Sequence, residues 1–240
     1  MQIIPAIDIR GGNCVRLMQG RLEQETIYSK DPVFMAKLWR AKGAERIHIV
    51  DLDGAFGGVP ANYEIIKSIR KEVDVALEVG GGIRDHETIE KLLNAGIDKV
   101  VLGTVAIYNT DLVKEAIKNH GDKIIIGIDA NNGRAAIGGW KEVTNVTDLD
   151  LAHNMEKIGV SEFIYTDISK DGMLEGPNLG GVKKFAESIK GKMIVSGGIA
   201  SVKDIENIVK LKMNNIDGII VGKALYAETL KLEDAIAAVK

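Results

Sequence analysis

The segment Ser-Gly-Gly-Ile-Ala at residues 196–200 repeats the segment Gly-Gly-Gly-Ile-Arg at residues 80–84, which lies 116 positions earlier. The same offset of 116 separates Asp51 from Asp167, and each of these aspartates ends an apolar run. Two more features recur in the same order, at offsets of 119 and 121: residues 100–106 return at residues 219–225, and Ile7-Asp8 returns as Ile128-Asp129. Four features that recur at about half the chain length indicate a duplicated half-domain.

The length and composition of the chain fit one domain built in this way. Barrels of about 240 residues routinely form a single unit, and no linker rich in Pro, Ser or Gly interrupts the middle of this chain. The net charge is −3, with basic and acidic residues interspersed, so we expect no nucleic-acid partner. A single cysteine, Cys14, excludes an intramolecular disulfide, and the N-terminal residues lack the features of a secretion signal. We therefore expect a soluble, cytoplasmic protein that does not bind a membrane.

Short apolar runs alternate along the chain with helix-like segments of about a dozen residues. Each run is nearly continuous, as a sheet that is buried on both faces requires. The predicted strands are residues 2–8, 46–51, 75–79, 98–102, 123–128, 162–167, 192–196 and 217–221. The predicted helices are residues 32–42, 61–71, 86–95, 110–119, 147–158, 178–189, 201–211 and 232–239.

Eight strand–helix units in two matching halves predict an α/β fold, the (β/α)8 TIM barrel, because crossover connections make the strands parallel and four plus four strands close the ring. We expect one barrel domain over residues 1–240, with half-barrels at roughly residues 1–120 and 121–240. An open doubly wound sheet is the alternative. Its phosphate-binding glycines normally cluster after one strand, whereas the glycine motifs here follow at least four.

These glycine motifs fall at the carboxyl ends of predicted strands, where active sites of the barrel fold lie. Glycine permits a sharp turn that brings backbone N–H groups against an anion. Any one of the motifs is equally well explained as an ordinary turn, but their pairing in adjacent loops predicts two phosphate cradles on opposite sides of the mouth. We expect a small substrate with a phosphate at each end, held by Gly81, Gly82, Gly103 and Thr104 on one side and by Gly197, Gly198, Gly222 and Lys223 on the other.

Asp8 and Asp129 end the first and fifth predicted strands, which face each other across an eight-stranded ring. Side chains alternate along a strand, so Asp8 shares its face with Ala6, and Asp129 shares its face with Gly127. Two opposed carboxylates suit general acid–base catalysis, in which one group donates a proton and the other removes one. The alternative is that each aspartate only caps a turn.

Other polar and aromatic residues are weaker candidates. Asp51, Thr166 and Asp167 end predicted strands, where each either orients a catalytic carboxylate or a substrate hydroxyl group or makes a structural hydrogen bond. His48 lies inside the second strand and is expected to be a hydrogen-bonded histidine of the core or of an interior layer. Trp140 follows the fifth strand, where its ring either stacks on a flat heterocycle or packs the loop down.

The sequence contains no cluster of His or Cys with the spacing of metal ligands, no Gly-x-Ser-x-Gly motif and no Walker sequence. We therefore expect no metal site, and no nucleotide or other cofactor.

Motifs along the whole chain resemble the phosphoribosylformimino-5-aminoimidazole carboxamide ribotide isomerase (ProFAR isomerase) family of histidine biosynthesis. The motifs that carry this resemblance are Pro5-Ala6-Ile7-Asp8, Gly11-Gly12, Val15-Arg16-Leu17, Val50-Asp51-Leu52-Asp53, Gly80-Gly81-Gly82-Ile83-Arg84, Gly138-Gly139-Trp140, Thr166-Asp167-Ile168-Ser169-Lys170-Asp171-Gly172 and Ser196-Gly197-Gly198-Ile199.

The resemblance implies an Amadori rearrangement of an aminoaldose to an aminoketose, on a substrate that carries two phosphates. It implies an intramolecular oxidoreductase that needs no cofactor and no obligatory protein partner. The family's roles map onto Asp8 as proton acceptor and Asp129 as proton donor, with Thr166 assisting. Arg16 and Trp140 join the glycine loops as expected substrate-binding residues.

Three alternatives stay open. The first is the related cyclase of the same pathway, which uses ammonia from a glutaminase partner; its first strand characteristically reads Cys-Leu-Asp with a lysine shortly after, whereas this chain has Ala6-Ile7-Asp8 followed by Arg16. The second is a dual-substrate isomerase that also serves tryptophan biosynthesis. The third is a non-catalytic barrel that binds a phosphorylated metabolite, but a binder of a bis-anion gains nothing from two added negative charges.

Overall fold

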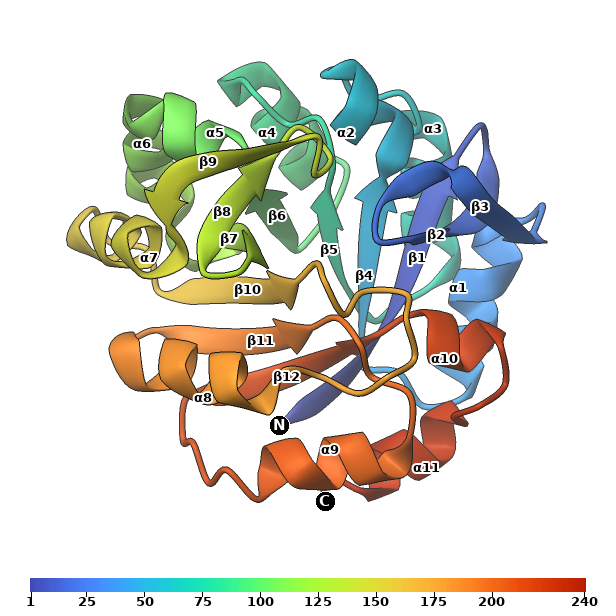
Figure 1. The fold of residues 1–240 in the computed structure, drawn as a ribbon. Coiled ribbons are helices and arrows are strands. Elements are labelled where there is room, and N and C mark those ends of the chain that lie inside the picture. Colours follow the sequence, from blue (N-terminus) through green and yellow to red (C-terminus); the bar gives the residue numbers. More distant parts are fainter.

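A computed structural model describes all residues, 1–240, and contains a closed barrel of parallel strands surrounded by helices (Figure 1). The barrel strands are β1 (Gln2–Arg10), β4 (Arg46–Asp51), β5 (Ala76–Gly80), β6 (Lys99–Leu102), β7 (Ile124–Asn131), β10 (Glu162–Asp167), β11 (Lys192–Ser196) and β12 (Ile216–Val221). β12 pairs with β1, and β10 pairs with β7, so the ring has no free edge. The barrel prediction is confirmed, and the open doubly wound sheet is excluded.

Eight helices that follow the barrel strands match the predicted helices: α1 (Pro32–Ala41), α3 (Tyr63–Glu72), α4 (His86–Asn94), α6 (Thr110–His120), α7 (Asp148–Lys157), α8 (Leu179–Ser188), α9 (Val202–Val209) and α11 (Leu232–Ala237). Their starts have local causes. The Asp31 side chain accepts a hydrogen bond from the Phe34 N–H, with Pro32 at the first helical position, and Ser201 and Asp204 form a capping box. No helix of the chain is both long and apolar enough to span a membrane.

Two antiparallel hairpins at the barrel mouth were not predicted from the sequence. β2 (Asn13–Met18) and β3 (Arg21–Ser29) follow β1, whereas β8 (Arg134–Ile137) and β9 (Glu142–Thr147) follow β7. β3 and β9 contain no buried residue, so their sequences lack the apolar runs by which the barrel strands were recognised. The hairpins occupy equivalent places in the two halves, which adds a further feature to the duplication.

The remaining elements are short. The helices α2 (Leu52–Gly57), α5 (Val105–Tyr108) and α10 (Lys223–Tyr226) lie in the loops after β4, β6 and β12, and a 3-10 turn, η1 (Gly121–Lys123), precedes β7. α5 and α10 begin just after the glycines of the fourth and eighth predicted loops. These helices therefore form part of the barrel mouth.

The interior of the barrel is solid. Six buried side chains fill its centre: Ile4, Ala6, Ile125, Ile164, Ile194 and Ile220. Near the amino ends of the strands, Arg46, Glu78, Lys99 and Glu162 form a group of ion pairs that we call the charge ring. The larger apolar core lies between the strands and the outer helices. Only the carboxyl end of the barrel is therefore hollow.

Candidate active site

A single cavity at the carboxyl ends of the barrel strands brings together the expected catalytic and substrate-binding residues; of the weaker candidates, Asp51 and Asp167 lie outside it. It is lined by Asp8, Arg16, Gly81, Gly82, Gly103, Thr104, Asp129, Trp140, Thr166, Gly197, Gly198, Gly222 and Lys223. These residues come from seven of the eight barrel strands or from the loops that follow them. The barrel geometry alone explains the convergence, because the carboxyl ends of all parallel strands meet at one rim.

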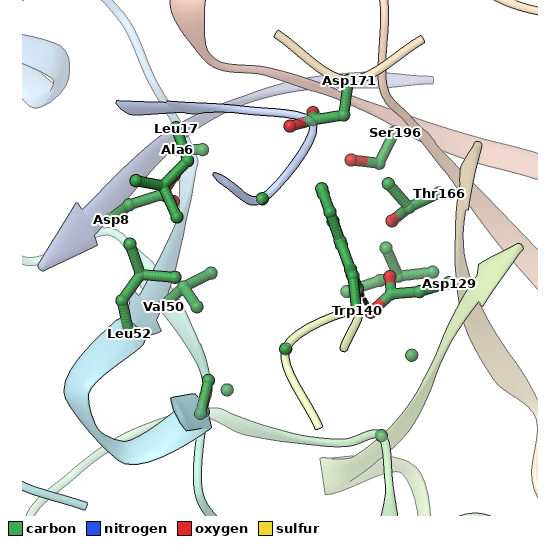
Figure 2. A pocket seen from close by; sticks show the side chains of 18 of the residues that line it. Ala6, Asp8, Leu17, Val50, Leu52, Asp129, Trp140, Thr166, Asp171 and Ser196 are labelled. Atoms are coloured by element: carbon green, nitrogen blue, oxygen red, sulfur yellow. Dashed lines mark hydrogen bonds between the residues drawn. The ribbon is translucent and has the colours of Figure 1, made fainter. Parts of the chain in front are cut away.

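Asp8 and Asp129 lie on opposite sides of this cavity (Figure 2). Each points inward because its strand neighbours two residues earlier, Ala6 and Gly127, also face the interior. An Arg16 guanidinium nitrogen lies 2.5 Å from the Asp8 Oδ2 atom, and the Arg16 side chain is largely buried. The Asp8 carboxyl group therefore faces a cation on its own side of the cavity.

The surroundings of Asp129 differ from those of Asp8. The Trp140 Nε1–H donates a hydrogen bond of 2.7 Å to Asp129 Oδ2, and Thr166 is the register partner of Asp129 on β10. Burial raises the pKa of the Asp129 carboxyl, and the hydrogen bonds from Trp140 and Thr166 and the charge of His48 only partly oppose this effect. A raised pKa favours the protonated form, which is the form that donates a proton.

Asp171 is a third carboxyl group of the cavity, and sequence reasoning did not nominate it as a site residue (Figure 2). Burial and the nearby Asp8 carboxylate raise its pKa to about 7, although Arg16 and Lys223 oppose the rise. Its loop is held in place by a 2.8 Å hydrogen bond from Lys223 Nζ to the Gly172 carbonyl oxygen. Asp171 lies in a loop beyond the end of β10, so the alternation of side chains along a strand could not predict where it points. Its position inside the 166–172 motif was the only signal in the sequence.

The glycines of the repeated segments are required by close packing of the loops. Gly81 and Gly197 have φ angles of 107° and 94°, a region that side chains disfavour. A Cβ atom on Gly81 would lie 2.2 Å from the Asp51 carbonyl oxygen, and one on Gly197 would lie 2.8 Å from the Asp167 carbonyl oxygen. The two halves therefore use the same contact, and this structural need is independent of any phosphate.

Asp51 and Asp167 serve these loops and not the cavity. Asp51 accepts hydrogen bonds from the backbone N–H groups of Gly54, Ala61 and Asn62. Asp167 accepts hydrogen bonds from Ser169 and from the Asn178 side chain. Of the two roles considered for these aspartates, the structural hydrogen bond is the one observed.

The loop after β6 leaves more room, whereas the loop after β12 is covered by a side chain. The nearest atom to a Cβ on Gly103 would be the Gly127 carbonyl oxygen at 3.8 Å. A Cβ on Gly222 would lie 2.8 Å from the Arg16 guanidinium carbon, so the Arg16 side chain passes directly over this glycine. Arg16 thus joins Asp8 to one of the two expected phosphate cradles.

Trp140 reaches from the β8–β9 hairpin into the mouth of the cavity (Figure 2). Its ring packs against Gly20 of the β2–β3 hairpin, where a Cβ atom would approach the ring to 2.5 Å. Its backbone has a positive φ of 68°. The loop-packing role considered for Trp140 is observed, and Trp140 also lines the cavity.

His48 is hydrogen-bonded, as predicted, through a 2.7 Å contact between Nδ1 and Glu78 Oε1. It also lines the cavity, which the sequence did not indicate. No group of three or more His, Cys, Asp or Glu side chains is arranged to hold a metal ion.

Comparison with known proteins gives nearly full-length matches. The Histidine biosynthesis protein family model matches residues 2–231. The 1-(5-phosphoribosyl)-5-((5-phosphoribosylamino)methylideneamino) imidazole-4-carboxamide isomerase of Geotalea daltonii is 49% identical over 237 residues, which cover 99% of this chain and 97% of that protein. The isomerase of the same name from Desulforamulus reducens is 48% identical over 236 residues, which cover 98% of this chain and 96% of that protein.

Proposed function

Because the chain belongs to the histidine biosynthesis protein family, we propose that it catalyses the Amadori rearrangement of N'-(5'-phosphoribosyl)formimino-5-aminoimidazole-4-carboxamide ribonucleotide. The reaction converts this aminoaldose to the corresponding aminoketose. The chain is an isomerase, an intramolecular oxidoreductase that moves hydrogen between two carbons of one sugar. Its substrate is a small molecule with a phosphate at each end.

The observation that carries this proposal is the pair of opposed carboxyl groups, Asp8 and Asp129, in one cavity between two glycine loops. Their environments differ in the sense that the reaction requires. The Asp8 carboxyl group is paired with the Arg16 guanidinium, whereas burial raises the pKa of Asp129 and favours its protonated form. Groups whose environments push their protonation states apart are suited to act as base and acid at one pH.

We assign the proton transfers as follows. Asp129, assisted by Thr166, donates a proton to the ring oxygen of the reacting ribose, the bond from C1 to that oxygen breaks, and a protonated Schiff base forms between C1 and nitrogen. Asp8 then removes the C2 proton, and the electron pair of that C–H bond forms the C1–C2 double bond while the imine nitrogen regains its lone pair. The resulting enolamine gains a proton at C1 and loses the proton of its C2 hydroxyl group, which gives the ketose.

Asp171 is a further carboxyl group in this cavity that can donate a proton. Its pKa of about 7 means that it holds a proton in a large share of molecules at neutral pH. It shares the cavity with Asp8 and Lys223, so it is a second candidate for returning a proton during the rearrangement. No step requires an external electron acceptor, because the nitrogen that gives up its lone pair when the ring opens regains it when the enolamine forms.

An absorbance assay with the aminoaldose tests the proposal. The purified chain, with EDTA present and without nucleotide, ammonia or a partner protein, is expected to produce the aminoketose. The rate is expected to fall on the acid side as the base becomes protonated. Addition of an ammonium salt should not consume the aminoketose.

Other outcomes select the alternatives. If the aminoaldose is inert and the aminoketose disappears only with ammonia, the chain is the cyclase. If both compounds bind without turnover, the chain is a non-catalytic binding protein.

A further inference from the structure

The floor of the cavity contains one polar side chain in an apolar setting. Beneath the carboxylates, the cavity is lined by Ala6, Val101, Ile164, Ile220 and His48. His48 on β4 is the register partner of Ala6 on β1, which places it one inward-facing layer below Asp8. A polar group in an apolar layer is costly unless each of its polar atoms has a partner.

One of the two ring nitrogens of His48 has a partner within the protein. Nδ1 lies 2.7 Å from Glu78 Oε1, and the Glu78 side chain is fully buried. Glu78 Oε2 lies 2.5 Å from the Arg46 guanidinium, and Glu78 Oε1 faces the His48 ring as a hydrogen-bond acceptor. The proton of a neutral His48 then resides on Nδ1, and Nε2 carries a lone pair.

The rest of the charge ring supports this arrangement. Arg46 also lies 2.8 Å from Glu162, which pairs in addition with Lys99. Although burial opposes ionisation, Arg46 and Lys99 hold the pKa of Glu162 below its ordinary value. Arg46 is thus fixed between two carboxylates, and Glu78 is fixed in turn. The charge ring at the closed end of the barrel therefore sets the orientation of the His48 imidazole in the cavity.

Nε2 of His48 makes no hydrogen bond within the protein and is not sealed from the cavity. We propose that His48 is a substrate-positioning residue, whose Nε2 accepts a hydrogen bond from a hydroxyl group of the reacting ribose while Glu78 and Arg46 fix the ring. The reacting sugar must lie between Asp8 and Asp129, directly above this floor, and the other floor side chains offer it no polar partner. This inference rests on the proposed isomerase function.

Two substitutions of His48 test the contacts of its two ring nitrogens separately. In His48→Asn the amide nitrogen replaces Nδ1 and keeps the Glu78 contact, but nothing reaches the cavity. In His48→Gln the amide reaches the place of Nε2, and the Glu78 contact is lost. We expect His48→Asn to lower kcat/KM by ~10- to 100-fold, as for one unmet hydrogen bond in a closed site, while its unfolding temperature stays near that of the wild type. His48→Gln should keep more activity than His48→Asn and should be the less stable of the two.

The matched control is His153→Asn, because His153 lies on the surface and contacts the Ser188 carbonyl oxygen. This control should leave kcat/KM unchanged. The inference is wrong if His48→Asn is as active as the wild type, or if activity follows stability so that His48→Gln is the less active variant.

A measurement independent of turnover reports the ring itself. Nitrogen-15 NMR of histidine-labelled protein should show neutral His48 with its proton on Nδ1, and the Nε2 signal should move when the aminoketose product is added. A proton on Nε2, or an Nε2 signal that product does not move, would overturn the inference. An inactive wild-type protein would instead count against the proposed function, so the two failures are distinguishable.

Discussion

At the scale of single residues, three aspartates of one cavity have different surroundings, and these surroundings affect the charge of their carboxyl groups differently. Asp8 is paired with Arg16, Asp129 is half-buried beside Trp140 and Thr166, and Asp171 is half-buried near Asp8. Burial disfavours the charged form of a carboxyl group, whereas a neighbouring cation favours it. One cavity can therefore present a base and an acid at the same pH.

Replacement of either opposed carboxylate should remove catalysis without unfolding the protein. Asp8→Asn and Asp129→Asn should each lower kcat by about 10²- to 10⁴-fold, which is the usual contribution of a positioned acid or base. KM should change much less, because the phosphate loops are untouched. Steady-state kinetics with the aminoaldose measures both values. A variant that keeps more than about a tenth of the wild-type kcat would show that its residue has another role.

The pKa of Asp171 predicts how its replacement affects stability. In the unfolded chain this carboxyl ionises near pH 4, whereas in the folded protein it ionises at about pH 7. The unfolded state therefore loses its proton first, and the cost of keeping this group folded grows from pH 4 and is complete above pH 7. Asn has no such cost, so Asp171→Asn should raise the unfolding temperature relative to the wild type more at pH 8 than at pH 5.

Thermal unfolding of both proteins at the two pH values measures this difference. The effect is at most about 1.4 kcal/mol for each pKa unit, and solvent in the open cavity reduces it. Asp234→Asn is the control, because Asp234 is exposed and its replacement should give nearly the same change at both pH values. A larger gain from Asp171→Asn at pH 5 would contradict the raised pKa.

At the scale of elements, the same loop device appears in both halves of the barrel. The loops after β5 and β11 pack against the turns at Asp51 and Asp167, and the adjacent loops after β6 and β12 leave Gly103 and Gly222 facing the cavity. Two equivalent pairs of loops on opposite sides suit the two ends of a bis-phosphate. We expect a crystal soaked in sulfate to show two anion sites, one at each pair. A single site, or sites away from these loops, would remove this support.

Gly222 allows a sharper test of one pair of loops. Alanine is disfavoured there for two reasons: the backbone angles, φ −111° and ψ −100°, lie outside the regions that residues with a side chain prefer, and the new methyl group would lie 2.8 Å from the Arg16 guanidinium carbon. Displacement of Arg16 should lower kcat/KM by ~10-fold or more, since overpacking of this kind typically costs 1–3 kcal/mol. Gly57→Ala is the matched control, because a Cβ there meets no atom within 4 Å. Equal kinetics of the two variants would show that the Gly222 contact does not matter.

At the scale of the whole molecule, the charge ring ties the two halves together. Arg46 and Lys99 come from the first half, and Glu162 comes from the second. Removal of one partner from a buried ion pair leaves an uncompensated charge, which typically costs about 3–5 kcal/mol. We expect Glu162→Gln to lower the free energy of unfolding by an amount of this order, measured with urea at pH 7.

The pH dependence of this effect has a definite sign. The pKa of Glu162 is lowered in the folded protein, so its stabilising contribution is present above the ordinary glutamate pKa and is lost as the pH falls through the folded value. The wild type should therefore lose its advantage over Glu162→Gln in acid. Glu187→Gln, which breaks the exposed Lys183–Glu187 pair, is the control and should change stability by less than about 1 kcal/mol at any pH.

The barrel fold and the position of the candidate site at one end of it could both be predicted from the chain alone. Strands buried on both faces require continuous apolar runs, and these runs, with the offset of 116 residues, were visible without coordinates. The inward direction of Asp8 and Asp129 followed from the alternation of side chains along a strand. Local rules of this kind act over a few residues, so one chain is enough to apply them.

Which groups meet is visible only in the folded barrel. The outer hairpin strands β3 and β9 contain no buried residue and carry no apolar signal, yet their hairpins bring Arg16 to Asp8 and Trp140 to Asp129. Asp171 enters the cavity from a loop, and His48 takes its orientation from Glu78 on the neighbouring strand. Pairing, burial and pKa depend on atoms that closure of the barrel brings together from distant parts of the chain, and no local pattern encodes those distances.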